Sequence, residues 1–360
     1  MSKRKLFRLF VVCTSMSLTV ASCVMPGKIS IGPTPYKDCV VNYFQDGPAD
    51  QARFGHISGL AITSTGSILV GDNYNRRIRS ISTDGKVTTF ASFEGPWSEP
   101  IVDLAVAPDD TVYFLSGDFL RKVDANGEIE TVAGSSNPFI GGFWQPWGMA
   151  VDNAGNVIVA DSRKNRIKKV TPNGDITELA GSGGIDLAPM SPAGGFADGP
   201  GASAMFHRPA SVATDASGNL YVADAANIRI RKISPELVVT TLAGSGISGH
   251  QDGPGSSAQF GNPQDIAATP DGTVYVVDAG NGSVRRITPS GEVSTLPAYR
   301  EGASKPTSIA VDASGSVYVG YFADQGELRG GEVLKYTQNE VFQLIAGELA
   351  ACDWQTKLAY

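Results

Sequence analysis

One short phrase recurs along this chain, and its repetition limits the available folds more than any other feature. In its clearest form it reads QPWGMAVD, at residues 145–152; the copies at 208, 262 and 305 keep the proline and the apolar run after it, and two further copies are weaker. The six starts are His56, Glu99, Gln145, Arg208, Asn262 and Lys305. Self-similarity at a period of roughly 50 residues is typical of a chain built from one repeated supersecondary unit. The sequence therefore predicts six such units.

Each unit continues with the same succession of segments. In the third unit, a Gly-bearing turn at residues 153–156 leads to an apolar run at 157–161 and an alternating basic run at 166–170. A second turn at 172–175 and an apolar stretch at 176–181 complete it. Short β-branched runs bounded by Gly-containing turns are typical of hairpins. Six units of four strands predict an all-β fold, a six-bladed β-propeller of antiparallel blades.

The units also resemble a known repeat family. Residues 220–233, LYVADAANIRIRKI, followed by VTTLAG at 239–244, resemble an NHL repeat, and residues 70–81 and 277–287 match the same pattern. The resemblance covers nearly all of residues 54–347. It implies the propeller fold and leaves the function open, since NHL-like propellers include protein binders, RNA binders and a few enzymes. The second unit departs from the pattern at residues 116–120, and the sixth carries an insertion at 323–330.

The N-terminus has the order of an export signal. Four basic residues among the first eight precede an apolar stretch at 9–21, which is too short for a spanning helix. The stretch ends at Ala21, Ser22 and Cys23, which resembles a bacterial lipobox. We expect residues 1–22 to be a lipoprotein signal peptide, Cys23 to be lipidated, residues 23–38 to form a Pro/Gly-rich tether and residues 39–360 to form the propeller. Lipidation would place the protein at the cell envelope, on the outer membrane or cell surface. The alternative is an ordinary signal with a chance cysteine.

The charge balance argues against a nucleic-acid partner. Removing residues 1–22 takes away four basic and no acidic residues, so the net charge of −7 becomes −11. Some NHL-like proteins bind RNA, and the third strands of four units carry short basic segments. These segments are Arg79-Ser80, Lys168-Lys169, Arg231-Lys232 and Arg285-Arg286. Because they are spread over several units of an acidic chain, we interpret them as solvated strand faces.

Two cysteines remain for the folded part, one near each of its ends. Cys13 lies in the signal and Cys23 is the lipidation candidate, which leaves Cys39 and Cys352. In an oxidising compartment such a pair is typical of a disulfide. We expect a Cys39–Cys352 bridge between the first and last segments. The alternative is two unrelated free thiols.

A second repeat lies in the connections between units. Residues 46–54, 198–206 and 252–260 each begin Asp-Gly-Pro and end in Phe. We expect the Phe to fill the gap between neighbouring blades and the Asp-Gly-Pro to form a turn. Calcium binding is the alternative, but one carboxylate per loop falls short of the six to eight oxygens that calcium prefers.

The candidate site is the face where each outer strand passes to the next inner strand. After the proline, the phrase places Ser58, Ile101, Trp147, Ala210, Gln264 and Thr307 around the channel, followed by Gly59, Val102, Gly148, Ser211, Asp265 and Ser308. If the second copy is longer by one residue, Asp103 joins the second ring and faces Asp265. Two carboxylates could share a hydrated divalent cation such as calcium. The alternative is that they cap strands and bind water.

The ring offers no recognisable catalytic constellation. Propellers similar to the amidating lyases hold zinc on histidines in this phrase, and gluconolactonase-like propellers use a Glu. None of the ring positions is His or Glu, and His56, His207 and His250 all fall in connecting loops. We therefore predict no catalytic residue. A metal-dependent hydrolase or lyase of either type remains the alternative.

Aromatic side chains indicate a binding surface instead. Trp97 and Trp147 precede or begin inner strands, and Tyr74, Arg76 and Arg166 lie in adjacent turns. Flat side chains with nearby donors suit protein and carbohydrate contacts. With Gln264 from the ring, these residues form the predicted ligand site. Phe143 and Trp144 are expected to fill an inter-blade gap. The predicted partner is an extracytoplasmic protein or a cell-envelope glycan.

Overall fold

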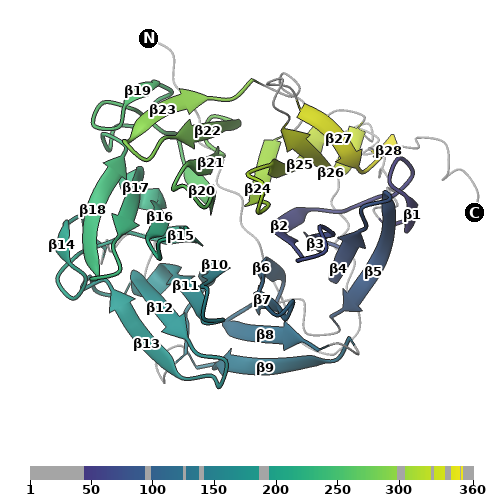
Figure 1. Cartoon of the computed structure of the whole chain (residues 1–360), viewed down its shortest axis with the longest axis horizontal. Coiled ribbons are helices and arrows are strands. Elements are labelled where there is room, and N and C mark those ends of the chain that lie inside the picture. The colour runs from purple at the N-terminus through teal and green to yellow at the C-terminus, as the bar shows by residue number, and fades with distance from the viewer. Residues whose placement is uncertain are drawn as a thin grey trace, which may run out of the picture. The chain divides into compact units, whose positions relative to one another are not determined.

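Six antiparallel sheets are arranged in a ring in the computed structural model of the protein (Figure 1). The structure describes residues 44–93, 99–124, 127–137, 142–185, 194–297, 305–325, 328–336, 342–348 and 350–351. These residues all belong to one unit, Cys39–Tyr360. The predicted signal and tether, together with Cys23, Cys39, Trp97 and Cys352, lie outside the described residues.

The first three blades follow one another along the chain. Blade 1 consists of β2 (Ile57–Ile62), β3 (Ile68–Asp72), β4 (Arg77–Ile81) and β5 (Lys86–Ser92). Blade 2 consists of β6 (Ile101–Val106), β7 (Val112–Ser116), β8 (Phe119–Val123) and β9 (Ile129–Gly134). Blade 3 consists of β10 (Pro146–Val151), β11 (Val157–Asp161), β12 (Arg166–Val170) and β13 (Ile176–Ala180), with the short 3₁₀ helix η1 (Ser162–Lys164) between its second and third strands.

The last three blades repeat this order. Blade 4 consists of β15 (Pro209–Thr214), β16 (Leu220–Asp224), η2 (Ala225–Asn227), β17 (Arg229–Ile233) and β18 (Val238–Ala243). Blade 5 consists of β20 (Pro263–Ala268), β21 (Val274–Asp278), β22 (Ser283–Ile287) and β23 (Glu292–Thr295). Blade 6 consists of β24 (Lys305–Val311), β25 (Val317–Gln325), β26 (Leu328–Tyr336) and β27 (Phe342–Ala346), with β28 (Ala350–Ala351) added to β26.

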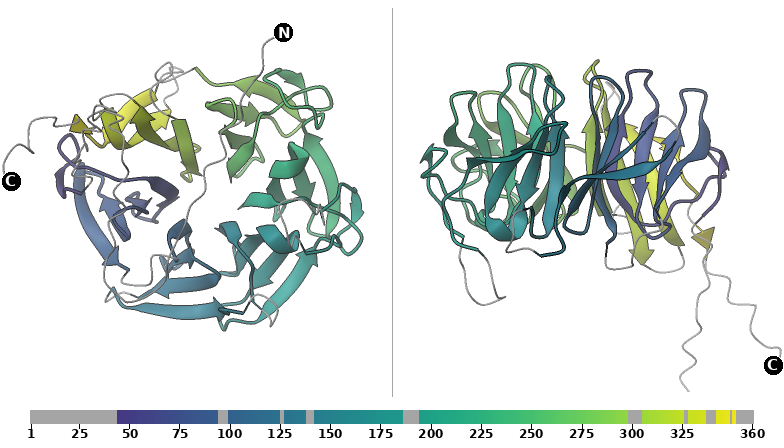
Figure 2. Two further views of the ribbon diagram at one scale, coloured as in Figure 1. Left: turned by 180° about the vertical axis from the view of Figure 1, so that it is seen from behind. Right: turned by 90° about the horizontal axis from the view of Figure 1, so that it is seen from below.

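Within each blade the strands run in sequence order from the inside of the ring to its edge. The first strand of each blade lies nearest the middle, and the fourth lies outside (Figure 1). The second strands β3, β7, β11, β16 and β21 are buried along their whole length. Their apolar runs are continuous because both faces of each sheet pack against a neighbouring blade, in hydrophobic clusters that adjacent blades share. Figure 2 shows the blades standing around the ring from the side. The predicted six-bladed propeller is confirmed.

The Asp-Gly-Pro connections add a short strand to the edge of three blades. Their Gly-Pro pairs form the two-residue strands β1 (Gly47–Pro48), β14 (Gly199–Pro200) and β19 (Gly253–Pro254), which pair with the outer strands β5, β18 and β23. A backbone turn follows each Gly-Pro pair. The Phe residues that end these connections, Phe54, Phe206 and Phe260, are fully buried in clusters shared by two blades. Their predicted role as inter-blade plugs is confirmed.

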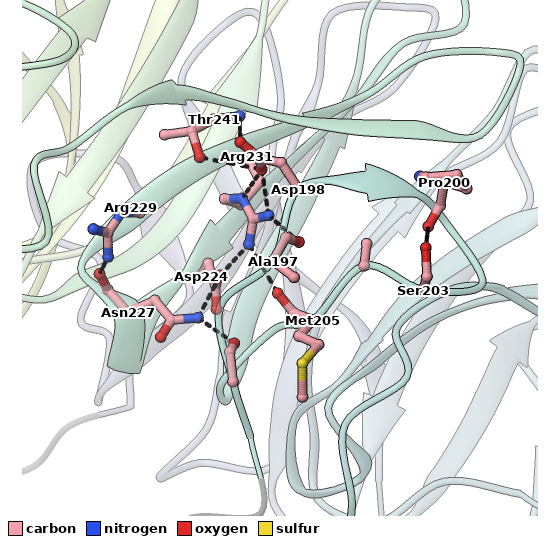
Figure 3. A network of polar contacts seen from close by, with 12 residues as sticks. Ala197, Asp198, Pro200, Ser203, Met205, Asp224, Asn227, Arg229, Arg231 and Thr241 are labelled. Carbon is pink, nitrogen blue, oxygen red and sulfur yellow. Dashed lines mark hydrogen bonds and ion pairs between the residues drawn. The ribbon is translucent and has the colours of Figure 1, made fainter.

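The basic segments are not solvated strand faces, so that interpretation was wrong. Arg79, Arg231, Arg285 and Lys168 are buried, although the second residue of each segment points outward. Alternation along a strand sends only one of two neighbouring side chains to solvent. Arg231 donates to Asp224 at 2.8 Å and to Asp198 of the Asp-Gly-Pro connection at 3.2 Å (Figure 3).

The same arrangement recurs in three blades. Arg79 pairs with Asp72 and Asp46, and Arg285 pairs with Asp278 and Asp252. Two carboxylates therefore enclose each buried guanidinium, one from the end of the second strand and one from the connection. Because the connection's Asp also accepts from a Thr of the outer strand, it ties the loop to its blade. In blade 3 Lys168 takes the place of Arg and pairs with Asp161 at 2.8 Å.

The ring closes with contacts from both ends of the folded unit. The backbone N–H of Gly347 donates to Ala49 O at 3.0 Å, and that of Glu348 donates to Ala52 O at 2.7 Å. The Arg53 and Glu348 side chains form an ion pair at 3.1 Å. Since β27 pairs with β26, the last blade keeps its own outer strand. Within the described part of the chain, no helix has the length and apolar character needed to cross a membrane.

Candidate functional site

A bulge in every inner strand creates the candidate site. In each of β2, β6, β10, β15, β20 and β24 the pairing register skips one residue near the strand start. In β10, Pro146 pairs with Asp161 and Gly148 with Ala160, which leaves Trp147 outside the ladder. A bulge frees a residue from pairing and redirects its side chain. The bulged residues are Ser58, Val102, Trp147, Ala210, Gln264 and Thr307.

The same register settles the composition of the second ring. In blade 2, Ile101 pairs with Ser116 and Asp103 with Leu115, so the phrase there is longer by one residue. Asp103 therefore stands where Asp265 stands in blade 5. Of the two alignments of the second copy, the longer one is therefore correct, and Val102 takes the first-ring place that the phrase had given to Ile101.

A cavity of about 660 Å³ opens at this mouth of the ring. Five of the bulged residues line it, Ala210 being the exception, together with both ring aspartates. From there the cavity extends over the connections of blades 1, 2 and 3. The described lining residues of those connections are His56, Asn73, Glu99, Pro100, Gly117, Asp118, Phe119, Ser136, Trp144, Gln145 and Pro146.

The ring aspartates connect successive blades. Asp103 accepts from the N–H of Leu104 in its own strand and from that of Met149 in blade 3, both at 2.8 Å. Asp265 accepts from the N–H groups of Ile266 and Ile309, also at 2.8 Å, and from Ser211 Oγ at 2.7 Å. Both carboxylates thus bind backbone donors at strand starts.

Their protonation is perturbed by this location. Burial, and then the charge of Asp265, raises the pKa of Asp103 well above its usual range. Burial also raises the pKa of Asp265 to about 6, although three donors lower it in part. The two groups therefore interact across the ring. Among the described residues no three His, Cys, Asp or Glu side chains gather as a metal site. Two carboxylates supply fewer oxygens than calcium takes, so water would have to complete its coordination.

Phe143 and Trp144, the two aromatic residues expected to fill an inter-blade gap, differ in their burial. Phe143 is fully buried and packs near Lys168, as a plug should. Trp144 lines the cavity and is only partly buried, so its predicted role as gap filler was wrong. The backbone N–H of Trp144 donates to Asp161 Oδ1 at 2.8 Å, which orients this connection. Successive residues of an extended segment point in opposite directions, and only one of the two rings can enter the gap.

Trp147 is the most exposed aromatic residue of the cavity. Its exposed fraction is 52%. Gln264 lines the cavity as well, so the structure brings Trp147, Gln264 and the two ring aspartates together. Tyr74 is also half exposed, and it reaches the cavity only through His56, whose ring centroid is 5.6 Å from its own.

The two predicted arginines lie elsewhere. Arg76 lies over the Phe93 ring, with 5.8 Å to the ring centroid. Arg166 donates to Gly183 O at 2.6 Å and lies 3.4 Å from Glu178. Neither lines the cavity within the described residues.

Several cavity residues escaped the sequence reasoning. Glu99 lies before β6 and pairs with Arg121 at 2.6 Å. Asp118 accepts from the Gln145 N–H at 2.7 Å, and burial raises its pKa. Asp118 lies in the one segment of blade 2 that departs from the repeat, which was the available signal. His56 also lines the cavity, and burial lowers its pKa.

Four-stranded blades in a ring of six, with a cavity at one mouth, define the chain as a six-bladed β-propeller. Comparison with family models makes the class more specific. The model described as NHL repeat matches residues 260–287, and the model described as Teneurin NHL domain matches residues 143–234. The protein is an NHL-repeat β-propeller.

Longer proteins of plants and animals are similar to this chain over part of their length. The chain is 28% identical over 273 residues to the chloroplastic protein SUPPRESSOR OF QUENCHING 1 of Arabidopsis thaliana, covering 68% of this chain and 26% of that protein. It is 32% identical over 213 residues to human Teneurin-4, covering 53% of this chain and 7% of that protein. The chain thus spans only a small part of these relatives.

Solved structures share the fold. Virginiamycin B lyase of Staphylococcus aureus is 18% identical with a TM-score of 0.54, covering 86% of this chain and 96% of that one. An auxiliary nutrient binding protein of Bacteroides thetaiotaomicron is 14% identical with a TM-score of 0.58, covering 76% and 69%. A gluconolactonase of Xanthomonas campestris is 13% identical with a TM-score of 0.54, covering 76% and 84%. Identities this low carry the fold alone, and the group contains both a binding protein and enzymes.

Proposed function

We propose that this protein is an exported, envelope-anchored recognition propeller that binds a glycan in the channel-mouth cavity and performs no catalysis there. The observation that carries the proposal is Trp147, a large aromatic side chain held half exposed by a strand bulge at the rim of a cavity of about 660 Å³. Exposed apolar surface beside polar groups marks interaction sites. A cavity of this size accommodates a small ligand or the end of a chain.

The chemistry around Trp147 suits a sugar. An indole ring offers a flat apolar face for the C–H groups of a pyranose, and its position on a strand keeps it oriented. Hydroxyl and amide groups from Ser58, Thr307, Gln264 and Asn73 line the same cavity and can exchange hydrogen bonds with sugar hydroxyls. A protein partner would instead need a larger and flatter surface than this concave mouth.

Glycan binding is tested by isothermal titration of the mature protein against the glycans that an array identifies. Replacing Trp147 with Ala should weaken binding by at least about tenfold, because a centrally placed Trp often dominates a contact. The matched control is Phe90→Ala, since Phe90 is also exposed but lies on the outer strand of blade 1. Equal losses in both variants, or none in either, would remove the proposed site.

The anchoring part of the proposal rests on the sequence around Cys23. Radiolabelled palmitate should enter the wild-type protein in a bacterial host, and Cys23→Ser should abolish both the label and the membrane association. A label that persists in the variant would contradict lipidation at this residue. Release of the wild-type protein in soluble form would contradict the anchor itself.

A second candidate is a metal-dependent propeller hydrolase or lyase, as the gluconolactonase and the lyase among the similar structures are named enzymes. The specific observation in its favour is the interacting pair Asp103 and Asp265 in the ring. A metal that prefers the folded state must raise its stability. A rise in Tm with calcium or zinc that chelator reverses, and that Asp103→Asn abolishes, would favour this candidate over simple recognition.

A further inference from the structure

The charged side chains that line the channel-mouth cavity are almost all acidic. Its described lining includes the carboxyl groups of Glu99, Asp103, Asp118 and Asp265 and no Lys or Arg. The remaining titratable group is His56, and burial favours its neutral form because it lowers the pKa. A ligand that enters this cavity therefore meets a negative potential.

The carboxylates at the rim of the cavity differ in their partners from the two at its floor, Asp103 and Asp265. On the rim, the charge of Glu99 is offset by Arg121 at 2.6 Å. The two floor aspartates differ, since the partners described for them are the backbone N–H groups and the Ser211 hydroxyl, which are all neutral. Neutral donors stabilise an anion without cancelling its field at a distance.

Other buried carboxylates of this propeller are treated differently. Asp72, Asp224 and Asp278 each lie against a buried arginine, and Asp161 lies against Lys168. The repeat thus supplies a cation to the buried carboxylate at the end of each of these four second strands, whereas Asp215, in a turn, is held by neutral donors from Asn219 and Tyr221. Asp103 and Asp265 stand at the inner ring, where the cavity is the space that they face in common. At pH 7.5, above its pKa of about 6, Asp265 is ionised, so the pair carries at least one charge that no described cation offsets and that can act on a ligand.

We propose that the cavity selects glycans by charge: it accepts sugars without a negative charge, stacked on Trp147, and rejects uronic and sialic acids through Asp103 and Asp265. This inference rests on the proposed glycan binding and specifies its ligand class. Two like charges within several ångströms in a partly dry cavity repel by enough to change affinity by at least about tenfold. Sugar hydroxyls, by contrast, can donate to carboxylate oxygens that still have free lone pairs.

Selectivity should also depend on pH. Uronic acids stay ionised well below neutrality, whereas burial raises the pKa of Asp265 to about 6. The other groups that face the cavity are His56, Glu99, Asp103 and Asp118. Lowering the pH from 7.5 to 5 protonates part of the floor, and it also favours the positive form of His56. Both changes reduce repulsion, so the rejection of acidic sugars should weaken.

The test is a glycan array that carries neutral oligosaccharides beside uronate-containing and sialylated ones, probed with the mature protein at pH 7.5. We expect hits among uncharged glycans and none among acidic ones. The quantitative step titrates trigalacturonate and its uncharged methyl ester, which share one ring geometry. The ester should bind at least about tenfold more tightly at pH 7.5, and the ratio should fall at pH 5.

Each result has a distinct meaning. Acidic glycans that bind as well as their neutral counterparts would overturn charge selection and leave the proposed glycan binding intact. An array without hits would overturn the glycan function, and this inference with it. Asp103→Asn/Asp265→Asn should narrow the gap between the acid and the ester at pH 7.5. If that variant does not fold, the pH dependence of the wild-type ratio decides the matter, because a ratio unchanged between pH 7.5 and 5 excludes the aspartates as its cause.

Discussion

At the scale of single residues, the buried arginines show how this repeat uses charge. Arg231 has no exposed side-chain surface, and its guanidinium contacts Asp224, Asp198 and two backbone carbonyls (Figure 3). Burying an ion is costly unless partners surround it. With its partners in place, the arginine holds the end of the second strand and the inter-blade connection together.

Removing the arginine from this network should therefore strongly destabilise the folded state. We expect Arg231→Met to lower the free energy of unfolding by about 3–5 kcal/mol, because Asp224 would remain buried without its cation. The control is Arg286→Met, since Arg286 is exposed on the next blade and should lose well under about 1 kcal/mol. Urea denaturation of both variants gives the comparison. Similar losses in the two would contradict the network's role.

The ring aspartates make the stability of this protein depend on pH in a definite direction. A folded-state pKa of about 6 for Asp265, above the usual value near 4, means that the folded protein retains a proton that the unfolded chain releases. The stability from this group is complete at low pH and is lost as the pH rises through about 6. Asp265→Asn removes that dependence.

We compare the free energy of unfolding of Asp265→Asn with that of the wild type at two pH values. The difference should favour the variant by about 2 kcal/mol more at pH 7.5 than at pH 4.5, because its amide carries no charge to bury. Denaturation at both pH values measures the difference, and comparing variant with wild type cancels the contributions of other groups. Asp271→Asn is the control, because hydrogen bonds lower the pKa of this exposed carboxyl, so it is ionised in the folded and unfolded states throughout this pH range and its relative stability should hardly change. A relative stability that is independent of pH would refute the raised pKa.

Residue identity predicted some of these positions and not others. The repeated phrase offered Asp103 a place in the ring on the condition that the second copy is longer by one residue, and the register of β6 meets that condition. The burial of Arg231 was not predicted, because the Asp198 that neutralises it lies in a separate connection and only folding brings the two together. The same applies to Trp144, whose direction depends on which neighbour enters the gap.

At the scale of elements, several crossings from an outer strand to the next blade depend on glycine. Gly244 ends the outer strand of blade 4 with φ of +105°, and its N–H donates to Gly255 O in the following connection at 2.9 Å. A methyl group there would lie 2.6 Å from the carbonyl oxygen of Ile228. Gly181 and Gly347 occupy the same place at two other crossings, with φ of +114° and +112°.

Gly244→Ala should consequently lower the free energy of unfolding by more than a positive φ alone explains. We expect a loss of about 3 kcal/mol, against about 1 kcal/mol for Gly155→Ala, whose φ is +78° but whose added methyl group would meet nothing within 4 Å. Thermal or urea unfolding of the two variants isolates the effect of the close contact. Equal losses would mean that the crossing can relax around a side chain.

The elements themselves were largely predictable because hairpins are local. Four strands per blade follow from alternation and turn residues close together in the sequence. The two-residue strands β1, β14 and β19 were not predicted, because Gly-Pro has no strand signal of its own. Their pairing depends on the outer strand that lies beside them after folding.

At the scale of the whole molecule, the ring is held shut by the repeat's own contacts. Gly347 N and Glu348 N bond to Ala49 O and Ala52 O just as Gly181 N and Ser182 N bond to Gly201 O and Ala204 O at an ordinary crossing. Residues 39–44 and 341–347 are both short apolar segments, and the sequence alone does not decide which of them forms the outer strand of blade 6, because that depends on how the two ends of the folded unit meet.

The expected disulfide would act at this seam. Phe44, five residues after Cys39, begins the described part of blade 1's connection, and β28 ends at Ala351, directly before Cys352. We predict that peptide mapping of the non-reduced mature protein will find Cys39 linked to Cys352. Closing a loop of roughly 300 residues would stabilise the fold by several kcal/mol on the chain-entropy model, so Cys39→Ser should lower the Tm.

Cys352→Ser should lower the Tm by the same amount, and the double variant should be no less stable than either single one, because both changes remove one bond. Reducing agent should bring the wild type to the level of the variants and leave the variants themselves unchanged. Alkylation of both thiols in the denatured but unreduced protein would exclude the bridge. In that case the backbone bonds of Gly347 and Glu348 and the Arg53–Glu348 ion pair would remain as the contacts that join the two ends of the ring.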